Sequence, residues 1–144
     1  MSSRTLLCFD FGNKRIGTAV GQTITGTATP LQIINCHNYQ PDWEKIELLI
    51  NDWKPDAIVV GVPLCMDGSP QEMTDAAARF SRQLEGRFRL PVYGMDERLS
   101  TYEAKDRSGG DREVDSIAAQ AILESWLVEN NVNLAEDEDN KFHA

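Results

Sequence analysis

The chain has 144 residues, of which 41% are apolar and 26% are charged. This is the composition of an ordinary globular protein, and the length suffices for one domain whose core needs no disulfide or metal. Cys8, Cys36 and Cys65 lie far apart in no CxxC pair, which argues against a disulfide framework or a zinc site. No apolar run has the length of a membrane span, and no signal-peptide pattern opens the sequence. We therefore expect a cytoplasmic protein without a membrane partner.

The net charge of −9 counts against nucleic acid as a partner, because phosphate binding favours basic surfaces. Residues 129–144 carry five acids and one base, which leaves a net charge of −5 for the other 128 residues. Any contact with nucleic acid must then come from a local basic patch. We expect one domain over residues 1–130, followed by an acidic, disordered tail at residues 131–144.

The first half of the chain predicts three strands and a helix. Antiparallel strands are expected at residues 5–11, 16–20 and 31–36, with Gly12 and Asn13 in the first turn. Pro41 and Asp42 open a helix, because apolar residues then recur at the spacing of one helix face. These residues are Ile46, Leu49, Ile50 and Trp53.

The second half alternates strands and helices. Strands are expected at residues 57–62 and 91–95, the first of them wholly apolar, as in a strand covered on both faces. A loop at residues 63–70 precedes a helix whose inner face carries Met73, Ala77, Phe80 and Leu84. A capping box at Ser100 and Glu103 opens a short helix that ends at Gly109 and Gly110, and residues 114–128 form the last helix.

This order predicts an α/β fold. Strands that are joined through helices run parallel, with right-handed crossovers. We expect a mixed sheet in which three antiparallel strands are followed by parallel strands with crossover helices, and helices on both faces of the sheet.

Three carboxylates are expected at one edge of this sheet. Asp10 lies near the carboxyl end of the first strand, Glu97 follows the last strand, and Asp115 opens the last helix. Sites in α/β sheets lie beyond the carboxyl ends of the strands. Singly, each acid has a simpler interpretation: a turn cap for Asp10, a solvated loop residue for Glu97 and a favourable first-turn charge for Asp115. An acid inside an apolar strand is costly, however, and this favours a functional Asp10.

Convergent carboxylates repel one another unless a cation holds them together. Hard oxygen ligands that leave room for water and phosphate favour Mg²⁺ or Mn²⁺. Two such ions about 4 Å apart would position the attacking water and the leaving oxygen of a phosphodiester. Asp10, Glu97 and Asp115 are therefore the candidate catalytic residues and metal ligands.

Four motifs resemble one known family. They are residues 10–17 (DFGNKRIG), 61–68 (GVPLCMDG), 96–101 (DERLST) and 114–119 (VDSIAA). Their sequence, order and spacing resemble the YqgF (RuvX-like) family of pre-16S rRNA nucleases, and the resemblance covers roughly residues 5–130. The chain departs from the family pattern between Thr101 and Asp115. The segment that joins these two residues is shorter than is usual for the family, and Asp111-Arg112-Glu113 stands where basic residues are expected.

The resemblance implies an RNase H-like nuclease domain over residues 1–130 that trims the 5′ end of the small-subunit ribosomal RNA precursor. Its acidic cluster maps onto Asp10, Glu97 and Asp115. Two alternatives stay open: a nuclease similar to Holliday-junction resolvases that cuts structured DNA, and a non-catalytic scaffold of the same fold in a ribosomal or nucleoprotein complex. The residues do not separate RNA from DNA, nor do they fix the oligomeric state.

Five basic residues are candidates for substrate binding. Lys14 and Arg15 follow Asp10 in the first turn, and Arg98 adjoins Glu97. Arg79 and Arg82 share one helix face within residues 79–90, which carry a net charge of +3 and form the best candidate patch for a nucleic-acid backbone. Each pair is equally compatible with an ordinary solvated surface.

Overall fold

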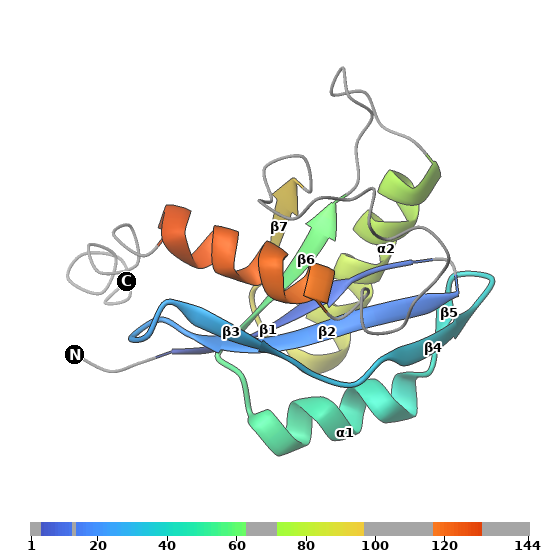
Figure 1. Cartoon of the computed structure of the whole chain (residues 1–144). Coiled ribbons are helices and arrows are strands. Elements are labelled where there is room, and N and C mark those ends of the chain that lie inside the picture. Colours follow the sequence, from blue (N-terminus) through green and yellow to red (C-terminus); the bar gives the residue numbers. More distant parts are fainter. Residues whose placement is uncertain (1–3, 13, 63–71, 97–116, 131–144) are drawn as a thin grey trace.

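The computed structural model describes residues 4–12, 14–62, 72–96 and 117–130 (Figure 1). The predicted loop 63–70, the short helix opened by Ser100 and the acidic tail 131–144 lie outside the described residues. The predicted last helix is described from residue 117 and extends to residue 130. No helix in these ranges is long and apolar enough to cross a membrane.

The described chain forms one sheet and three helices. The strands are β1 (Thr5–Asp10), β2 (Arg15–Gln22), β3 (Thr27–Pro30), β4 (Ile34–His37), β5 (Gln40–Pro41), β6 (Ala57–Val62) and β7 (Val92–Asp96). The helices are α1 (Trp43–Trp53), α2 (Glu72–Phe88) and a C-terminal helix over residues 117–130.

The sheet combines an antiparallel and a parallel half, as predicted. Its strand order is β5-β4-β2-β1-β6-β7, with β3 beside β4 on the outer side of β2. β1 pairs antiparallel with β2 and parallel with β6, and β6 pairs parallel with β7. β1, β6 and β7 therefore end at one edge of the sheet, which we call the carboxyl edge.

The predicted third strand at residues 31–36 is wrong in its bounds. Two short strands take its place: β3 pairs with the second half of β2, and β4 pairs with Arg15 and Ile16 at its start. Between them the Thr18 carbonyl accepts a hydrogen bond from Leu31 N at 2.8 Å, and the Thr18 hydroxyl donates to the Gln32 carbonyl. Both hydrogen bonds hold the segment between the two short strands against β2.

Helices cover both faces of the sheet. In Figure 1, α1 lies below the sheet and the C-terminal helix lies above it. The side chains of β1 alternate between the two faces, as period-two packing requires. Leu7 and Phe9 belong to the core shared with α1 and α2, which also contains Ile46, Leu49, Ile58, Val60, Ala77, Phe80 and Leu84. Leu6 and Cys8 belong to the core under the C-terminal helix, which also contains Ala19, Val59, Met95, Ala119, Leu123 and Leu127.

One predicted core residue of α1 is exposed. Ile46, Leu49 and Ile50 are buried as expected, but Trp53 is 41% exposed. Asp42 caps the first turn, where its side chain accepts a hydrogen bond from Lys45 N at 3.4 Å. Lys54 ends the helix in the left-handed conformation, so Trp53 is its last residue and lies where the helix no longer faces the core.

Gly21 of β2 allows the C-terminal helix to pack closely on the sheet. A Cβ atom at this position would lie 2.8 Å from the Thr27 carbonyl oxygen and 3.0 Å from Leu123 Cδ2. We expect Gly21→Ala to lower the free energy of unfolding by about 1–3 kcal/mol, because the strand and the helix must both move. Thermal unfolding measures this loss. Gly86→Ala in α2 is the control, since nothing lies within 4 Å of its Cβ position, and it should keep or raise stability. Equal unfolding midpoints for Gly21→Ala and wild type would contradict this close packing at Gly21.

Candidate active site

Asp10 is the last residue of β1, and its Cα pairs with that of Gly17 in β2. Its side chain is only 3% exposed, and among the charged residues that the structure describes it is the one that is buried. The residue lies within the sheet ladder, so the turn-cap interpretation does not apply. A carboxylate is rarely buried without a compensating charge or hydrogen bonds, and this keeps Asp10 the leading candidate for a functional role.

The side chain of Asp10 lies on the face of the sheet that the C-terminal helix covers. Leu6 and Cys8, four and two positions earlier in β1, are packed in the core under that helix. With a period of two, Asp10 continues the same row. Leu123 and Leu127 approach the Cβ position of Gly21, which pairs with Leu6 at the start of β1. The later part of the helix therefore covers the start of β1, and in Figure 1 its first turn points toward the side on which β1 ends.

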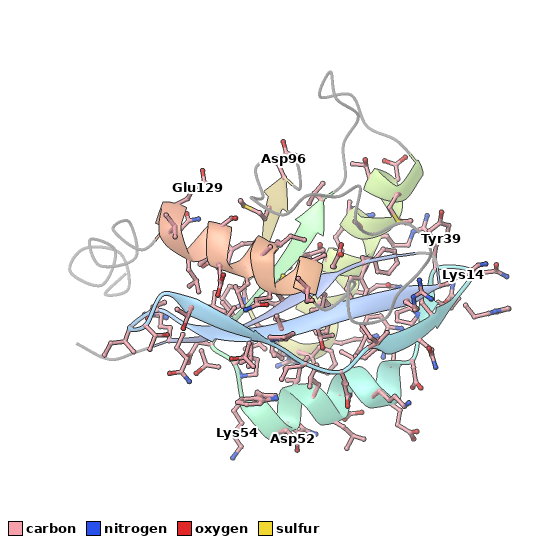
Figure 2. The ribbon with its side chains drawn as sticks, viewed as in Figure 1. Lys14, Tyr39, Asp52, Lys54, Asp96 and Glu129 are labelled. Atoms are coloured by element: carbon pink, nitrogen blue, oxygen red, sulfur yellow. The ribbon has the colours of Figure 1, made fainter. Side chains whose placement is uncertain are left out.

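The end of β7 lies at the same carboxyl edge. Phe9 pairs with Val60, and Val60 pairs with Gly94, so Asp10 is level with Met95. Met95 is 3% exposed and belongs to the core under the C-terminal helix, on the same face as Asp10. Asp96 is the next residue and the last of β7 (Figure 2), so the alternation places it on the opposite face.

Glu97, Arg98 and Asp115 lie outside the described residues. Glu97 immediately follows the end of β7, and Asp115 comes two positions before the first described residue of the C-terminal helix. Of the three predicted carboxylates, the described part of the chain contains Asp10 alone. The clustering of the three therefore stays a prediction.

Arg15 is the first residue of β2 and Lys14 directly precedes it, near Asp10. Arg15 is two positions before Gly17, the partner of Asp10, so its side chain lies on the face of Asp10 and is half-buried. Lys14 is exposed, and its carbonyl accepts a hydrogen bond from Cys36 N at 2.8 Å. Both residues lie close to the carboxyl edge, and the side chain of Arg15 is on the same face of the sheet as Asp10.

Arg79 and Arg82 do not lie on the face of Asp10. Both are exposed on α2, whose buried side chains pack on the opposite face of the sheet. Arg87, from the same basic stretch, has its guanidinium carbon 4.1 Å from the ring centroid of Trp43 in α1. The stretch therefore serves partly to join α1 to α2, and it is separated from Asp10 by the sheet.

Gly12 lets the chain turn directly after Asp10 and Phe11. A Cβ atom at this position would lie 2.5 Å from the carbonyl oxygen of Arg15, which is a backbone atom and cannot rotate away. We expect Gly12→Ala to open the first turn, displace Asp10 and lower the free energy of unfolding by about 1–3 kcal/mol. Thermal unfolding measures the loss, with Gly86→Ala again as the control. An unfolding midpoint equal to that of wild type would contradict this account of the turn.

An aromatic column supports the end of β1, and the sequence patterns did not reveal it. Phe11 stacks on Phe80 with ring centroids 4.7 Å apart and on Tyr39 with centroids 6.1 Å apart. Trp43 lies 5.7 Å from Phe80. The rings come from four separate elements, so no local periodicity signals their contact. The column lies on the face opposite Asp10 and fixes the backbone that carries it.

The described cysteines are structural. Cys8 and Cys36 are both free and buried. Burial raises the pKa of the Cys36 thiol, while a hydrogen bond from the Tyr39 backbone acts in the opposite direction. A neutral, buried thiol is neither a nucleophile nor a metal ligand.

Comparison with known proteins places the chain in a family. Residues 4–129 match the family described as "RuvX: Holliday junction resolvase". The chain belongs to this family. A Pseudomonas aeruginosa (strain PAO1) protein is 52% identical over 135 residues, which cover 88% of this chain and 94% of that protein. A protein of Azotobacter vinelandii is 52% identical over 134 residues, with the same shares covered. Both carry the name "Putative pre-16S rRNA nuclease".

Solved structures confirm the fold of this RuvX family member. The Thermus thermophilus RuvC structure in complex with a Holliday junction substrate has a TM-score of 0.59 at 14% identity, and the match covers 90% of this chain and 96% of that one. A second Thermus thermophilus RuvC structure has a TM-score of 0.53 at 11% identity, covering 88% and 95%. The predicted RNase H-like fold is therefore confirmed. The family match and the relatives at 52% identity confirm the class of enzyme, a nuclease acting on ester bonds.

Proposed function

We propose that this nuclease hydrolyses phosphodiester bonds of RNA in a metal-dependent reaction, and that it processes the 5′ end of pre-16S ribosomal RNA in the cytoplasm. The observation that carries the proposal is the buried carboxylate of Asp10 at the carboxyl edge of three parallel strands. The 52% identity to proteins named for pre-16S rRNA supports this choice of substrate.

The residues of the site fit Mg²⁺ or Mn²⁺. Asp10 offers hard oxygen donors in a position that is 3% exposed, and a cation offsets the cost of burying its charge. The described part of the site contributes no thiolate or imidazole that would favour a softer metal. Asp10, Glu97 and Asp115 would hold the metal, which when bound stabilises the charge that develops on the phosphate.

Glu97 is a better candidate ligand than its neighbour Asp96. Met95 lies on the face of Asp10, and Asp96 lies on the opposite face. In an extended chain the second position after Met95 returns to the face of Asp10, and that position is Glu97. For Asp115, the support is that the helix following it covers this same face.

The basic residues divide into two groups. Arg15 lies on the face of Asp10 and is proposed to pair with a phosphate of the substrate, with Lys14 beside it and Arg98 next to Glu97. Arg79 and Arg82 face away from Asp10. We propose that they contact only a substrate long enough to pass around the edge of the sheet.

A second candidate function is cleavage of structured DNA. The family description, "Holliday junction resolvase", favours it, and the chemistry at Asp10 would be the same. A non-catalytic scaffold of this fold is the third candidate. It would have no need of a carboxylate that is buried at the carboxyl edge.

Cleavage of two labelled substrates separates these functions. One is a single-stranded RNA that spans a precursor 5′ end, and the other is a four-way DNA junction, each with Mg²⁺ or Mn²⁺ and with a chelator as the control. We expect metal-dependent cleavage of the RNA. Cleavage of the junction alone would replace RNA by DNA as the substrate, and inertness toward both would favour the scaffold.

A further inference from the structure

The β4–β5 hairpin turns in an unusual way. His37 pairs with Gln40, so only Asn38 and Tyr39 form the turn. Both have positive φ angles, 50° and 63°, as in the two-residue turn known as type I′. Asparagine is common at the first of these positions, whereas the second is dominated by glycine.

Tyr39 is therefore in a conformation that its side chain disfavours. A bulky residue at positive φ is a true outlier, and such strained residues persist where the surrounding structure holds them and where a function needs them. Glycine at position 39 would make the same turn without strain. The ring must therefore contribute something that glycine lacks.

The ring of Tyr39 joins the hairpin to the end of β1. It stacks on Phe11 at an interplanar angle of 21°, and Phe11 directly follows Asp10. Tyr39 is nevertheless only partly buried, whereas Phe11 is 4% exposed. The turn thus holds a partly accessible aromatic ring just past the end of β1, on the side of the sheet opposite Asp10. A strand that passes over the end of β1 can reach both.

A cation lies near the hairpin that carries this ring. Lys14 is exposed, and its carbonyl accepts the hydrogen bond from Cys36 N in β4, so the start of β2 runs next to the hairpin. Figure 2 shows Lys14 and Tyr39 at the same end of the molecule. An aromatic ring beside a cation is the usual surface for a single nucleic-acid strand, because the ring stacks on a base and the cation meets the backbone.

We propose that Tyr39 is a base-stacking residue for a single-stranded substrate, with Lys14 on the adjoining phosphate. This subsite rests on the proposed function and deepens it. It favours an unpaired strand, because the bases of a duplex are already stacked on one another. The strain at Tyr39 is retained because stacking needs the aromatic ring at this turn.

Matched substitutions separate stacking from packing. Tyr39→Leu and Tyr39→Trp both keep an apolar side chain at positive φ against Phe11, but only tryptophan keeps an aromatic face. Binding is measured by fluorescence anisotropy of a labelled single-stranded RNA and of a DNA of the same sequence, with each variant in an Asp10→Asn background so that nothing is cut. We expect Tyr39→Leu to weaken binding about 5- to 100-fold and Tyr39→Trp to preserve it.

Salt dependence distinguishes the two residues of the subsite. Lys14→Ala should lower the slope of log affinity against log salt by about one, whereas Tyr39→Leu should leave that slope unchanged. Asn38→Gly changes the other residue of the turn without removing the ring, and it should bind as tightly as the parent.

The outcomes distinguish this proposal from the proposed function. If Tyr39→Leu binds as tightly as the parent, or if the leucine and tryptophan variants lose affinity equally, stacking at Tyr39 is overturned while cleavage by the native chain still supports a nuclease. If the parent binds neither single strand and the native chain cuts neither substrate, the proposed function fails together with the subsite. Should Tyr39→Leu unfold, Tyr39→Gly provides the same test without strain.

Discussion

Asp10→Asn is expected to reduce cleavage by at least about 100-fold. The substitution preserves the shape of the side chain and removes the charge that a metal requires. Loss of a group that merely supports a metal ligand costs about 10- to 100-fold, so loss of a ligand should cost at least as much. Initial rates of RNA cleavage in Mg²⁺ and in Mn²⁺ measure the effect.

The same substitution should also remove the stabilisation that bound metal gives. Asp10 is 3% exposed, so a metal that it holds is bound by the folded chain. Added Mg²⁺ or Mn²⁺ should raise the thermal midpoint of wild type and leave that of the variant unchanged. A variant that cuts RNA at the wild-type rate would remove Asp10 from the site.

Asp56→Asn is the matched control for this experiment. Asp56 lies at the opposite end of β1, where its carboxylate accepts a hydrogen bond from Thr5 N at 2.8 Å. Its substitution changes the protein charge by the same amount. It should leave the cleavage rate and the metal-dependent stabilisation unchanged.

Phe80→Ala should cause the largest loss of stability. The ring is 1% exposed and lies 4.7 Å from Phe11 and 5.7 Å from both Phe9 and Trp43, measured between centroids. Replacing a buried phenylalanine by alanine lowers the free energy of unfolding by about 3–5 kcal/mol, because the transfer free energy of the ring is lost and a cavity is left behind. For a chain of this size the thermal midpoint should fall by about 6–20 °C.

The neighbouring residue gives the control for Phe80. Arg79 precedes it in α2 and is exposed, so Arg79→Ala should change stability by less than about 0.5 kcal/mol. Chemical denaturation of both variants at one temperature measures the difference. Equal stability of Phe80→Ala and wild type would contradict the central place of this ring in the core.

Much of the fold could be predicted because its core elements have strong patterns. The wholly apolar run at β6 and the periodic apolar residues of α1 and α2 report burial directly. The end of β1 was predicted with Asp10 in place, since an acid in an apolar strand stands out. The parallel order of the later strands follows from the helices between them.

The predictions of strand bounds and of burial are wrong where contacts between distant parts of the chain determine the structure. The hydroxyl of Thr18 donates to the Gln32 carbonyl between β3 and β4, and no local pattern reveals that bond. Trp53 continues the apolar periodicity of α1, but it is the last residue of the helix and its side chain is exposed.

The position of Asp10 at the end of β1 agrees with the sequence, while its role in a site stays a prediction. The residue types identified Asp10, but they could not tell that the sheet separates Arg79 and Arg82 from it. That separation depends on which face each crossover helix covers. The predicted partners of Asp10, Glu97 and Asp115, lie outside the described residues and are tested only by experiment.

The central claim is that Asp10, Glu97 and Asp115 hold one metal site, and equilibrium binding of Mn²⁺ tests it most directly. Titration calorimetry compares wild type with Asp10→Asn, Glu97→Gln and Asp115→Asn, and with Asp56→Asn as the control. We predict that wild type and the control bind Mn²⁺ alike and that each of the other three binds at least about tenfold more weakly. Unchanged binding in Asp10→Asn, or no binding by wild type, would contradict the claim.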